Sequence, residues 1–316
     1  MSIMQSREQG IVDITEQLIE DWLADERGDL KAEPTITAYR KGIDIYKAWR
    51  VKRGIQDEHA RASDIRDFRS YLTELGYAAQ TVNLRLAAVR SFYRWAVNND
   101  RLPYSPASEI RGATRHKSTH HKRDALTPSE VKAVLATCDP STPAGARDMA
   151  ILILMAYCAL RSIEVHRATI GDLKTSGDRL VLAVQGKGRD EPDDIVIIPR
   201  DQEHHIRTWL VYRTGLGLRG PETPLFCGFS TRSHGGPLSL RTIRRIVTAH
   251  YEEAGVVGET KTTHSLRHSA ITSAIRNGAT PMQVQAMARH ASFDTTLGYV
   301  AEVNRIDAPA EDLIKY

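Results

Sequence analysis

The chain has 316 residues, of which 41% are hydrophobic and 26% charged, a composition that excludes an intrinsically disordered protein. This length exceeds what one compact core needs, so we expect two domains. The longest apolar run, residues 149–160, falls short of the ~18 apolar residues that a membrane-spanning helix requires. The first residues lack the basic and then apolar pattern of a secretory signal, and we therefore expect a cytoplasmic protein without membrane association.

Three cysteines, Cys138, Cys158 and Cys227, are widely scattered along the chain. An odd number at such spacing predicts neither a disulfide framework nor a zinc site. We expect each thiol to be a small buried hydrophobic group.

The positive charge is concentrated in the first part of the chain. The formal net charge is +4; residues 1–123 hold 21 Lys and Arg against 17 Asp and Glu, whereas the remaining residues hold 22 of each. The segment Arg111–Arg123 carries five basic residues and three histidines with no acidic residue. Two interpretations stay open: a solvated spacer, or a strap in which Lys117, Lys122 and Arg123 bind the phosphates of a nucleic acid.

The periodicity of residues 13–99 is helical throughout. Helices are expected over residues 14–24 and 35–49, where apolar residues recur at helical spacing. Ser63 has the character of an N-cap, so a third helix should begin there and stop at Gly76.

A fourth predicted helix begins at Thr81 and is apolar on two sides. The narrow edge between its apolar arcs carries polar, basic and small residues: Asn83, Ala87, Arg90, Arg94 and Asn98. Such an edge suits close approach to DNA, with Asn83, Arg90 and Arg94 as the contacts. A core helix with a solvated edge fits the periodicity equally well.

A second core is predicted to follow. Thr127 has the position of an N-cap, and Glu130 completes a capping box with it. Residues 146–160 are almost wholly apolar, which predicts the central helix of this core, ending at Arg161.

Two runs with strand character, residues 179–184 and 194–199, flank a glycine-containing tip. They predict a β-hairpin with Lys187 projecting from its turn. The chain is then expected to return to helix over residues 201–215.

Basic residues mark a further predicted helix, capped by Ser239 and running to about Ala254. Arg241, Arg244 and Arg245 lie on it. This face could enter a groove of DNA, with Arg241 and Arg244 as contacts, or could simply be solvated.

Groups able to act on a phosphate follow near the C-terminus. His264 and Arg267 are one turn apart at the start of one predicted helix; His290 precedes a short loop, and Tyr299 follows with eight residues between them. Guanidinium groups can bind two phosphate oxygens and stabilise charge developing on them, and imidazoles can move protons. A tyrosine hydroxyl can attack phosphorus.

In this order and spacing, these residues resemble the C-terminal signature of the tyrosine recombinases, the family of phage integrases and Xer-type recombinases. Residues 81–96 resemble the helical core-binding domain of integrases. The roles that the resemblance implies are as follows: Arg161 and Arg267 clamp the scissile phosphate, Lys187 is the general acid, His264 and His290 assist proton transfer and hydrogen bonding, Tyr299 is the nucleophile, and Glu164 braces Arg161.

The resemblance also implies a fold and a function. The fold is mainly α with a small β-sheet, in two domains that form a clamp around DNA: a helical core-binding (SAM-like) domain over residues 1–110, a basic linker over 111–125, and an α+β catalytic domain with a C-terminal tail over 126–316. The function is site-specific recombination through a 3′-phosphotyrosine intermediate and a Holliday junction, for integration, excision or resolution. The implied partners are double-stranded DNA with inverted-repeat core sites and further copies of the chain in a tetramer; no cofactor and no metal are implied.

Two positions depart from the family pattern. Ala159 and Arg289 stand where the family commonly has glycine, before Leu-Arg and before His. The first departure should alter packing behind Arg161, and the second adds a cation near the site. Neither removes a catalytic group.

Other interpretations stay open. A type IB topoisomerase would share the tyrosine chemistry but relax DNA without exchanging partners, and a non-catalytic DNA-binding protein could use the same scaffold. A metal site is not predicted: His264 and His268 have the i, i+4 spacing of a zinc pair, but the glutamate between such a pair in metalloproteases is missing and Arg267 lies beside them. We expect His268 to be a buried histidine that forms hydrogen bonds behind the active site. The tail beyond Pro309 is expected to dock on a neighbouring protomer or to fold back on its own domain.

Overall fold

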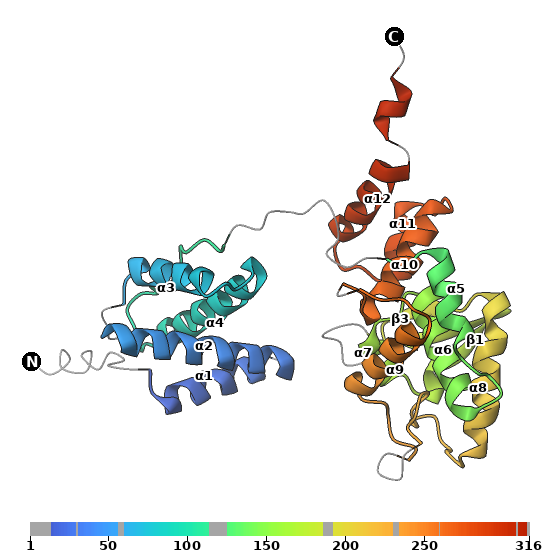
Figure 1. Ribbon diagram of the computed structural model, residues 1–316. Helices are drawn as coiled ribbons and strands as arrows, with labels where there is room; N and C mark the ends of the chain where they lie inside the picture. Colours follow the sequence, from blue (N-terminus) through green and yellow to red (C-terminus); the bar gives the residue numbers. More distant parts are fainter. Residues whose placement is uncertain are drawn as a thin grey trace, which may run out of the picture. The chain divides into compact units, whose positions relative to one another are not determined.

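The structure is a computed structural model and describes residues 14–29, 31–55, 60–113, 125–185, 192–229, 234–258, 260–307 and 309–314. The chain forms two compact units, unit 1 (Met1–Lys117) and unit 2 (Ser118–Tyr316), both drawn in Figure 1. Most of the described chain is helical, and its strands form one three-stranded sheet. The predicted fold, mainly α with a small β-sheet, is confirmed.

Unit 1 consists of four helices in the part of it that the structure describes: α1 (Glu16–Gly28), α2 (Glu33–Arg53), α3 (Ala62–Glu74) and α4 (Ala79–Asn98). The four predicted helices are present, but α2, α3 and α4 begin earlier than expected and α1 begins two residues later. The N-cap of α3 is Arg61 and not Ser63, because the Arg61 N–H donates to the Asp64 carboxylate at 2.7 Å. Helix α4 begins two residues before Thr81.

The core of unit 1 is built where α2 packs on α4. Gly42 permits a close approach, since a Cβ at this position would lie 2.7 Å from the Cβ of Ala88. Deeper in the core the hydroxyls of Tyr46 and Tyr93 are hydrogen-bonded at 2.8 Å. Aromatic rings therefore fill this core while their polar ends remain paired.

Unit 2 begins with α5 (Pro128–Ala136), for which Thr127 is the N-cap and Glu130 completes a capping box, as predicted. The other described elements, in chain order, are α6 (Pro143–Tyr157), α7 (Ser162–Arg167), η2 (Ile170–Asp172), β1 (Leu173–Ser176), β2 (Arg179–Val184), β3 (Asp194–Ile197), η3 (Arg200–Gln202), α8 (Glu203–Gly215), α9 (Leu240–Glu253), α10 (Thr263–Arg276), α11 (Pro281–Ala288), α12 (Phe293–Asp307) and η4 (Ala310–Leu313).

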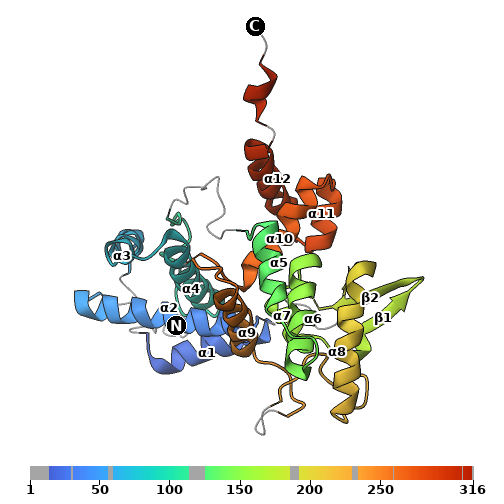
Figure 2. The same cartoon turned by 45° about the vertical axis from the view of Figure 1, so that its right-hand side comes forward.

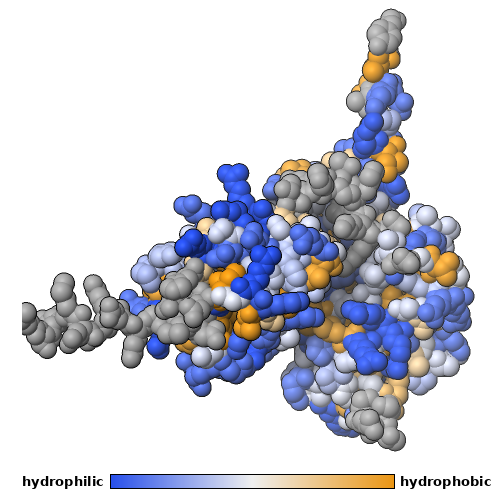
Figure 3. Space-filling view, turned by 60° about the vertical axis from the view of Figure 1, so that its left-hand side comes forward, coloured by the Kyte–Doolittle hydropathy of each residue, from blue (hydrophilic) through white to orange (hydrophobic). Residues whose placement is uncertain are grey.

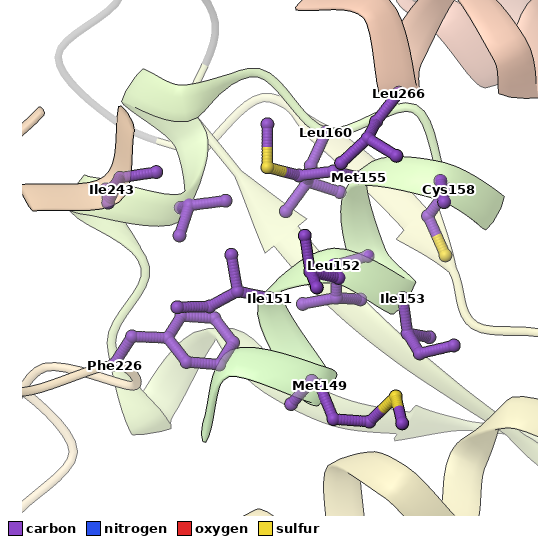
Figure 4. Close-up of a cluster of buried hydrophobic side chains, with 14 of the residues drawn as sticks. Met149, Ile151, Leu152, Ile153, Met155, Cys158, Leu160, Phe226, Ile243 and Leu266 are labelled. Atoms are coloured by element: carbon purple, nitrogen blue, oxygen red, sulfur yellow. The ribbon is translucent and has the colours of Figure 1, made fainter. Parts of the chain in front are cut away.

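Helix α6 is the centre of the unit 2 core. Its side chains are buried on all sides, and Figure 4 shows Ile151, Leu152 and Met155 among residues contributed by other elements, such as Phe226 and Leu266. A helix that is apolar all round is expected to be enclosed in this way. The prediction of a central core helix is confirmed.

The end of α6 differs from the prediction. The helix stops at Tyr157, because Ala159 adopts a left-handed backbone conformation with φ of 53°. Arg161 is therefore not the last residue of the buried helix but the N-cap of α7. This turn directs the chain out of the core at the position where the site begins.

The sheet is antiparallel with strand order β1-β2-β3. Strands β2 and β3 form the predicted pair, with Val181 opposite Ile197; β1 was not predicted. The sheet lies beside α8 in Figure 2, and the first residue of α8, Glu203, accepts a hydrogen bond from the Leu180 N–H. Residues 186–191, which include Lys187, lie outside the described residues, so the predicted turn is not tested.

The surface seen in Figure 3 is mainly hydrophilic, and apolar residues are scattered over it in small patches. No helix in the described part of the chain has the length and apolar character needed to cross a membrane.

Candidate active site

Arg161 is fixed by the carboxylate of Glu164. The Arg161 backbone N–H donates to Oε2 of Glu164 at 2.7 Å, and its Nη1 donates to Oε1 at 2.8 Å. Glu164 is buried, whereas 27% of the Arg161 side chain is exposed. The capping box that begins α7 thus also orients a guanidinium that solvent can reach.

Arg267 comes from the first turns of α10 and is buried. It donates to the carbonyl oxygens of Ala159 and Ala288. Arg161 also donates to the Ala288 oxygen, at 3.3 Å. The two guanidiniums predicted to bind one phosphate are therefore held side by side at a shared acceptor.

The pKa of Arg267 is lowered to about 9, chiefly by burial and also by the positive charges of Arg161 and Arg289. Glu164 and Tyr299 act in the opposite direction. Arg267 remains protonated at neutral pH. Because neighbouring cations destabilise one another when they are buried, an anion bound between them gains electrostatic energy.

Tyr299 lies on α12 between two imidazoles. Its ring stacks on that of His290, with centroids 5.8 Å apart and an angle of 12° between the planes. It forms a T-shaped contact with the ring of His268, with centroids 5.1 Å apart. Nδ1 of His290 is 2.9 Å from the hydroxyl of Thr296, which fixes the orientation of the ring. Tyr299 as a whole residue is 5% exposed.

Three helices and the end of α6 bring these groups together. Helices α10, α11 and α12 pack on one another, as Figures 1 and 2 both show, and Tyr299 shares a small apolar cluster with Ala159 and Ala288. The backbone that supplies the carbonyl acceptors for the arginines is thus part of the packing around Tyr299. Arg161, Arg267, His290 and Tyr299 form one site.

His264 and Arg161 line a groove of about 570 Å³ together with Arg244 of α9 and Lys261. Arg244 was predicted as a DNA contact, whereas Lys261 was missed, although it stands only three residues before His264. Lys261 is ion-paired with Glu130 at 2.8 Å. The groove adds two cations to the side of the site where Arg161 is exposed.

The other predicted DNA contacts fall into two groups. On α4, Asn83 exchanges hydrogen bonds with the backbone of Ala113, at 2.7 and 3.1 Å, and Arg90 donates to the Ile110 carbonyl, whereas Arg94 is exposed. Asn83 and Arg90 thus anchor the end of unit 1. On α9, Arg241 and Arg245 are exposed.

Four predicted site residues lie outside the described residues: Lys117, Lys122, Arg123 and Lys187. Within the described ranges, no three His, Cys, Asp or Glu side chains gather as a metal site would require.

Arg289 has contacts that the sequence did not predict. Its guanidinium reaches the Glu164 carboxylate, with Nη2 2.8 Å from Oε2, and its side chain is 6% exposed. The signal in the sequence was the replacement of a glycine by arginine just before His290.

Comparison with known families agrees with this geometry. Residues 124–305 match the phage integrase family, and residues 19–100 match the phage integrase N-terminal SAM-like domain. A tyrosine recombinase of Synechococcus elongatus is 27% identical over 301 residues, which cover 91% of this chain and 88% of that protein. The tyrosine recombinase XerD of Xanthomonas axonopodis is 29% identical over 276 residues, covering 85% and 87%.

Solved structures show the same fold. The XerH site-specific recombinase in a post-cleavage complex with its difH substrate aligns with a TM-score of 0.73 at 18% identity, covering 98% of this chain and 90% of that one. A lambda integrase tetramer bound to a Holliday junction aligns with a TM-score of 0.64 at 17% identity, covering 92% and 78%. The chain belongs to the phage integrase family of tyrosine recombinases, enzymes that cleave and rejoin DNA strands in site-specific recombination.

Proposed function

We propose that Tyr299 is the nucleophile of this recombinase and that Arg161 and Arg267 bind the phosphate that it attacks. The observation that carries the proposal is the convergence of both guanidiniums on the Ala288 carbonyl, in the cluster that also holds the Tyr299 ring against His290. A phosphodiester bound there meets two cations and a hydroxyl from one side.

The chemistry follows from these groups. The Tyr299 oxygen forms a bond to phosphorus while the bond to the 5′ oxygen breaks, which leaves a 3′-phosphotyrosine and a free 5′ hydroxyl. Negative charge grows on the non-bridging oxygens, where Arg161 and Arg267 stabilise it. The proton of Tyr299 must leave and the 5′ oxygen must gain one; His264 and His290 assist these transfers, and Lys187 is the general acid.

The link to phosphorus conserves the energy of the broken bond. The free 5′ hydroxyl of a second strand can attack the phosphotyrosine in turn, so that strands are exchanged without an external energy source. Exchange of one pair of strands gives a Holliday junction, and exchange of the second pair resolves it. We assign integration, excision or resolution of DNA to this reaction, and we place it in the cytoplasm.

Each part of the chain has a role in DNA binding. Residues 1–110 form the core-binding domain and residues 126–316 the catalytic domain, and the basic linker 111–125 joins them on a common DNA duplex. The proposed contacts with DNA are Arg94, Lys117, Lys122, Arg123, Arg241 and Arg244. In α9 this role is supported by the groove in which Arg244 lies next to Arg161. Asn83 and Arg90, which the sequence also predicted as contacts, instead use their side chains to hold the backbone of Ala113 and Ile110.

The proposed assembly is a tetramer on paired core sites with inverted repeats. The lambda integrase tetramer on a Holliday junction, which shares the fold, supports it. The tail beyond Pro309 is proposed to link protomers, and the exposure of Leu313 and Ile314 is consistent with that role.

Relaxation of DNA without exchange is the competing activity. It is not favoured, because residues 19–100 match the N-terminal domain of integrases. A plasmid with two core sites distinguishes the two activities: recombination yields products with exchanged flanks, whereas relaxation changes only the topology. Covalent complexes should form in excess EDTA, since the cations proposed to act on the phosphate are side chains. Failure to form any covalent complex on a core site would contradict the proposal.

A further inference from the structure

Arg289 occupies a backbone position that favours glycine. It ends α11 with φ of 53°, in the left-handed region, where its Cβ is unfavourable. Ala159, at the other departure from the family pattern, has the same φ. The chain tolerates an arginine there, and its side chain is not left in solvent.

The guanidinium of Arg289 connects three segments. Nη2 donates to Glu164 Oε2 at 2.8 Å and to the Ala159 carbonyl at 3.1 Å, while Nε lies 3.4 Å from Glu164 Oε1. Nη1 donates to the Met287 carbonyl at 2.6 Å. Arg289 therefore ties the end of α11 to the start of α7 and to the turn that follows α6.

Glu164 is thus shared between two arginines. Its carboxylate accepts from Arg161 on one side and from Arg289 on the other, and only 2% of its side chain is exposed. Burial raises the pKa of Glu164, but the charge and hydrogen bond of Arg289, followed by the contacts of Arg161, hold it below the ordinary value. A buried carboxylate with one cationic partner fewer would be harder to keep ionised.

The charges also set the field at the phosphate. Arg161, Arg267 and Arg289 with ionised Glu164 carry a formal charge of +2, whereas the same cluster with glycine at position 289 would carry +1. Attack on a phosphodiester adds negative charge to the phosphoryl oxygens. A buried extra cation therefore favours the transition state more than the ground state.

We propose that Arg289 is a positioning residue for the reaction. It keeps Glu164 ionised, so that this carboxylate holds Arg161 in place. Its positive charge also offsets the charge of Glu164, so that the cluster with Arg161 and Arg267 keeps a net positive charge that binds the phosphate. Arg289 does not contact the substrate in this scheme; its donors are directed at Glu164, Ala159 and Met287. The inference rests on the function proposed for Arg161 and Arg267.

Two substitutions at position 289 separate side-chain charge from backbone strain. Arg289→Gly removes the cation and relieves the left-handed backbone, so its backbone effect is stabilising. Arg289→Lys keeps the charge but loses the planar fork. Ala159→Gly relieves the same φ without a change of charge and is therefore the control for the effect of backbone strain on thermal stability.

The first measurement is the single-turnover rate of covalent complex formation on a nicked core site at saturating protein. We expect Arg289→Gly to slow this step by about 10- to 100-fold with DNA affinity within about threefold, and Arg289→Lys to recover part of the rate. The proposal is overturned if Arg289→Gly keeps a rate within about twofold of the wild type, or if Arg289→Lys is no faster than Arg289→Gly. Loss of thermal stability with an unchanged rate for the folded protein would also overturn it.

The second measurement needs no DNA and no activity. The carboxyl ¹³C signal of Glu164, assigned with Glu164→Gln, reports its protonation. The charged groups around this carboxylate are three arginines: Arg161 and Arg289 contact it, and Arg267 on α10 interacts with it electrostatically at longer range. The buried Cys158 thiol at the end of α6 adds no charge, because its pKa is raised to about 12. Since Arg289 lowers the pKa of Glu164, its replacement by glycine must raise it.

This expected rise in the pKa of Glu164 predicts two results. In Arg289→Gly the signal should titrate at higher pH than in the wild type, and the cleavage rate should fall more steeply with decreasing pH through that range than the wild-type rate does. An unchanged titration would show that Arg289 does not control Glu164. If the wild type forms no covalent complex, the proposed function fails, yet this titration still decides the action of Arg289 on Glu164.

Discussion

Arg161 and Arg267 donate to the same oxygen atom, the carbonyl of Ala288 at the end of α11. The two arginines stand more than a hundred residues apart in the chain, and a single backbone acceptor sets their separation. Helices end with unpaired carbonyls, and the left-handed turn after Ala288 leaves this one available. The position of α11 therefore decides whether both guanidiniums can bind one phosphate.

Alanine substitutions should separate the chemical and structural parts of this pair. Arg161→Ala and Arg267→Ala should each reduce the rate of covalent complex formation by at least about 100-fold, as loss of one donor to a developing oxyanion does. Only Arg267→Ala should clearly lower the free energy of unfolding, by about 1–2 kcal/mol, because a buried side chain is lost and the carbonyls of Ala159 and Ala288 each lose one of two donors. Glu164 keeps Arg289 when Arg161 is removed. Chemical denaturation of both variants tests this contrast, and equal loss of stability would contradict it.

Neighbouring arginines on α9 provide a test of the groove. Arg244 lines it with Arg161, whereas Arg245 is exposed but is not among its lining residues. We expect Arg244→Ala to weaken DNA binding by roughly tenfold and to reduce the slope of log K against log salt by about 1, since one phosphate contact is lost. Arg245→Ala is the matched control and should have a smaller effect. The same loss in both variants would show that the groove has no particular role.

The basic linker is predicted to contact phosphates without regard to sequence. Replacing Lys117, Lys122 and Arg123 together by alanine should weaken binding to core-site and random DNA by a similar factor. The salt dependence should become less steep, because fewer counterions are released. Titrations at several salt concentrations give the slope; an unchanged slope would mean that the segment is only a spacer.

Local patterns predicted much of this structure. The capping box at Thr127, the apolar run of α6 and the Ser239 N-cap depend on residues within a few positions of one another. The pairing of His290 with Tyr299 is also local: eight residues separate them in the chain, and α12 begins between them. Such signals can be recognised in the chain before it is folded.

What the sequence did not predict depends on distant partners. Alanine favours helix, so the only signal for a left-handed residue at Ala159 was the glycine that the family commonly has there. The conformation is compensated by the donors of Arg267 and Arg289, which bind the Ala159 carbonyl from far along the chain. The pairing of Arg289 with Glu164 joins residues 125 positions apart. Strand β1 escaped notice because it has four residues, three of them exposed.

Tyr299→Phe is the decisive substitution, because it removes one oxygen and leaves the ring that packs between His268 and His290. On a core site nicked beside the cleavage point, the short fragment with the 5′ hydroxyl diffuses away, so wild-type protein should accumulate as a covalent complex linked through a 3′-phosphotyrosine. The variant should bind the site within about tenfold of the wild type, ~1.4 kcal/mol, yet form no complex, because the nucleophile alone has been lost. Electrophoresis under denaturing conditions separates the adduct, and mass spectrometry of the digested complex identifies the linked residue. A covalent complex formed by Tyr299→Phe would place the nucleophile elsewhere, and the assignment of the site around Arg161, Arg267 and His290 would then have to be abandoned.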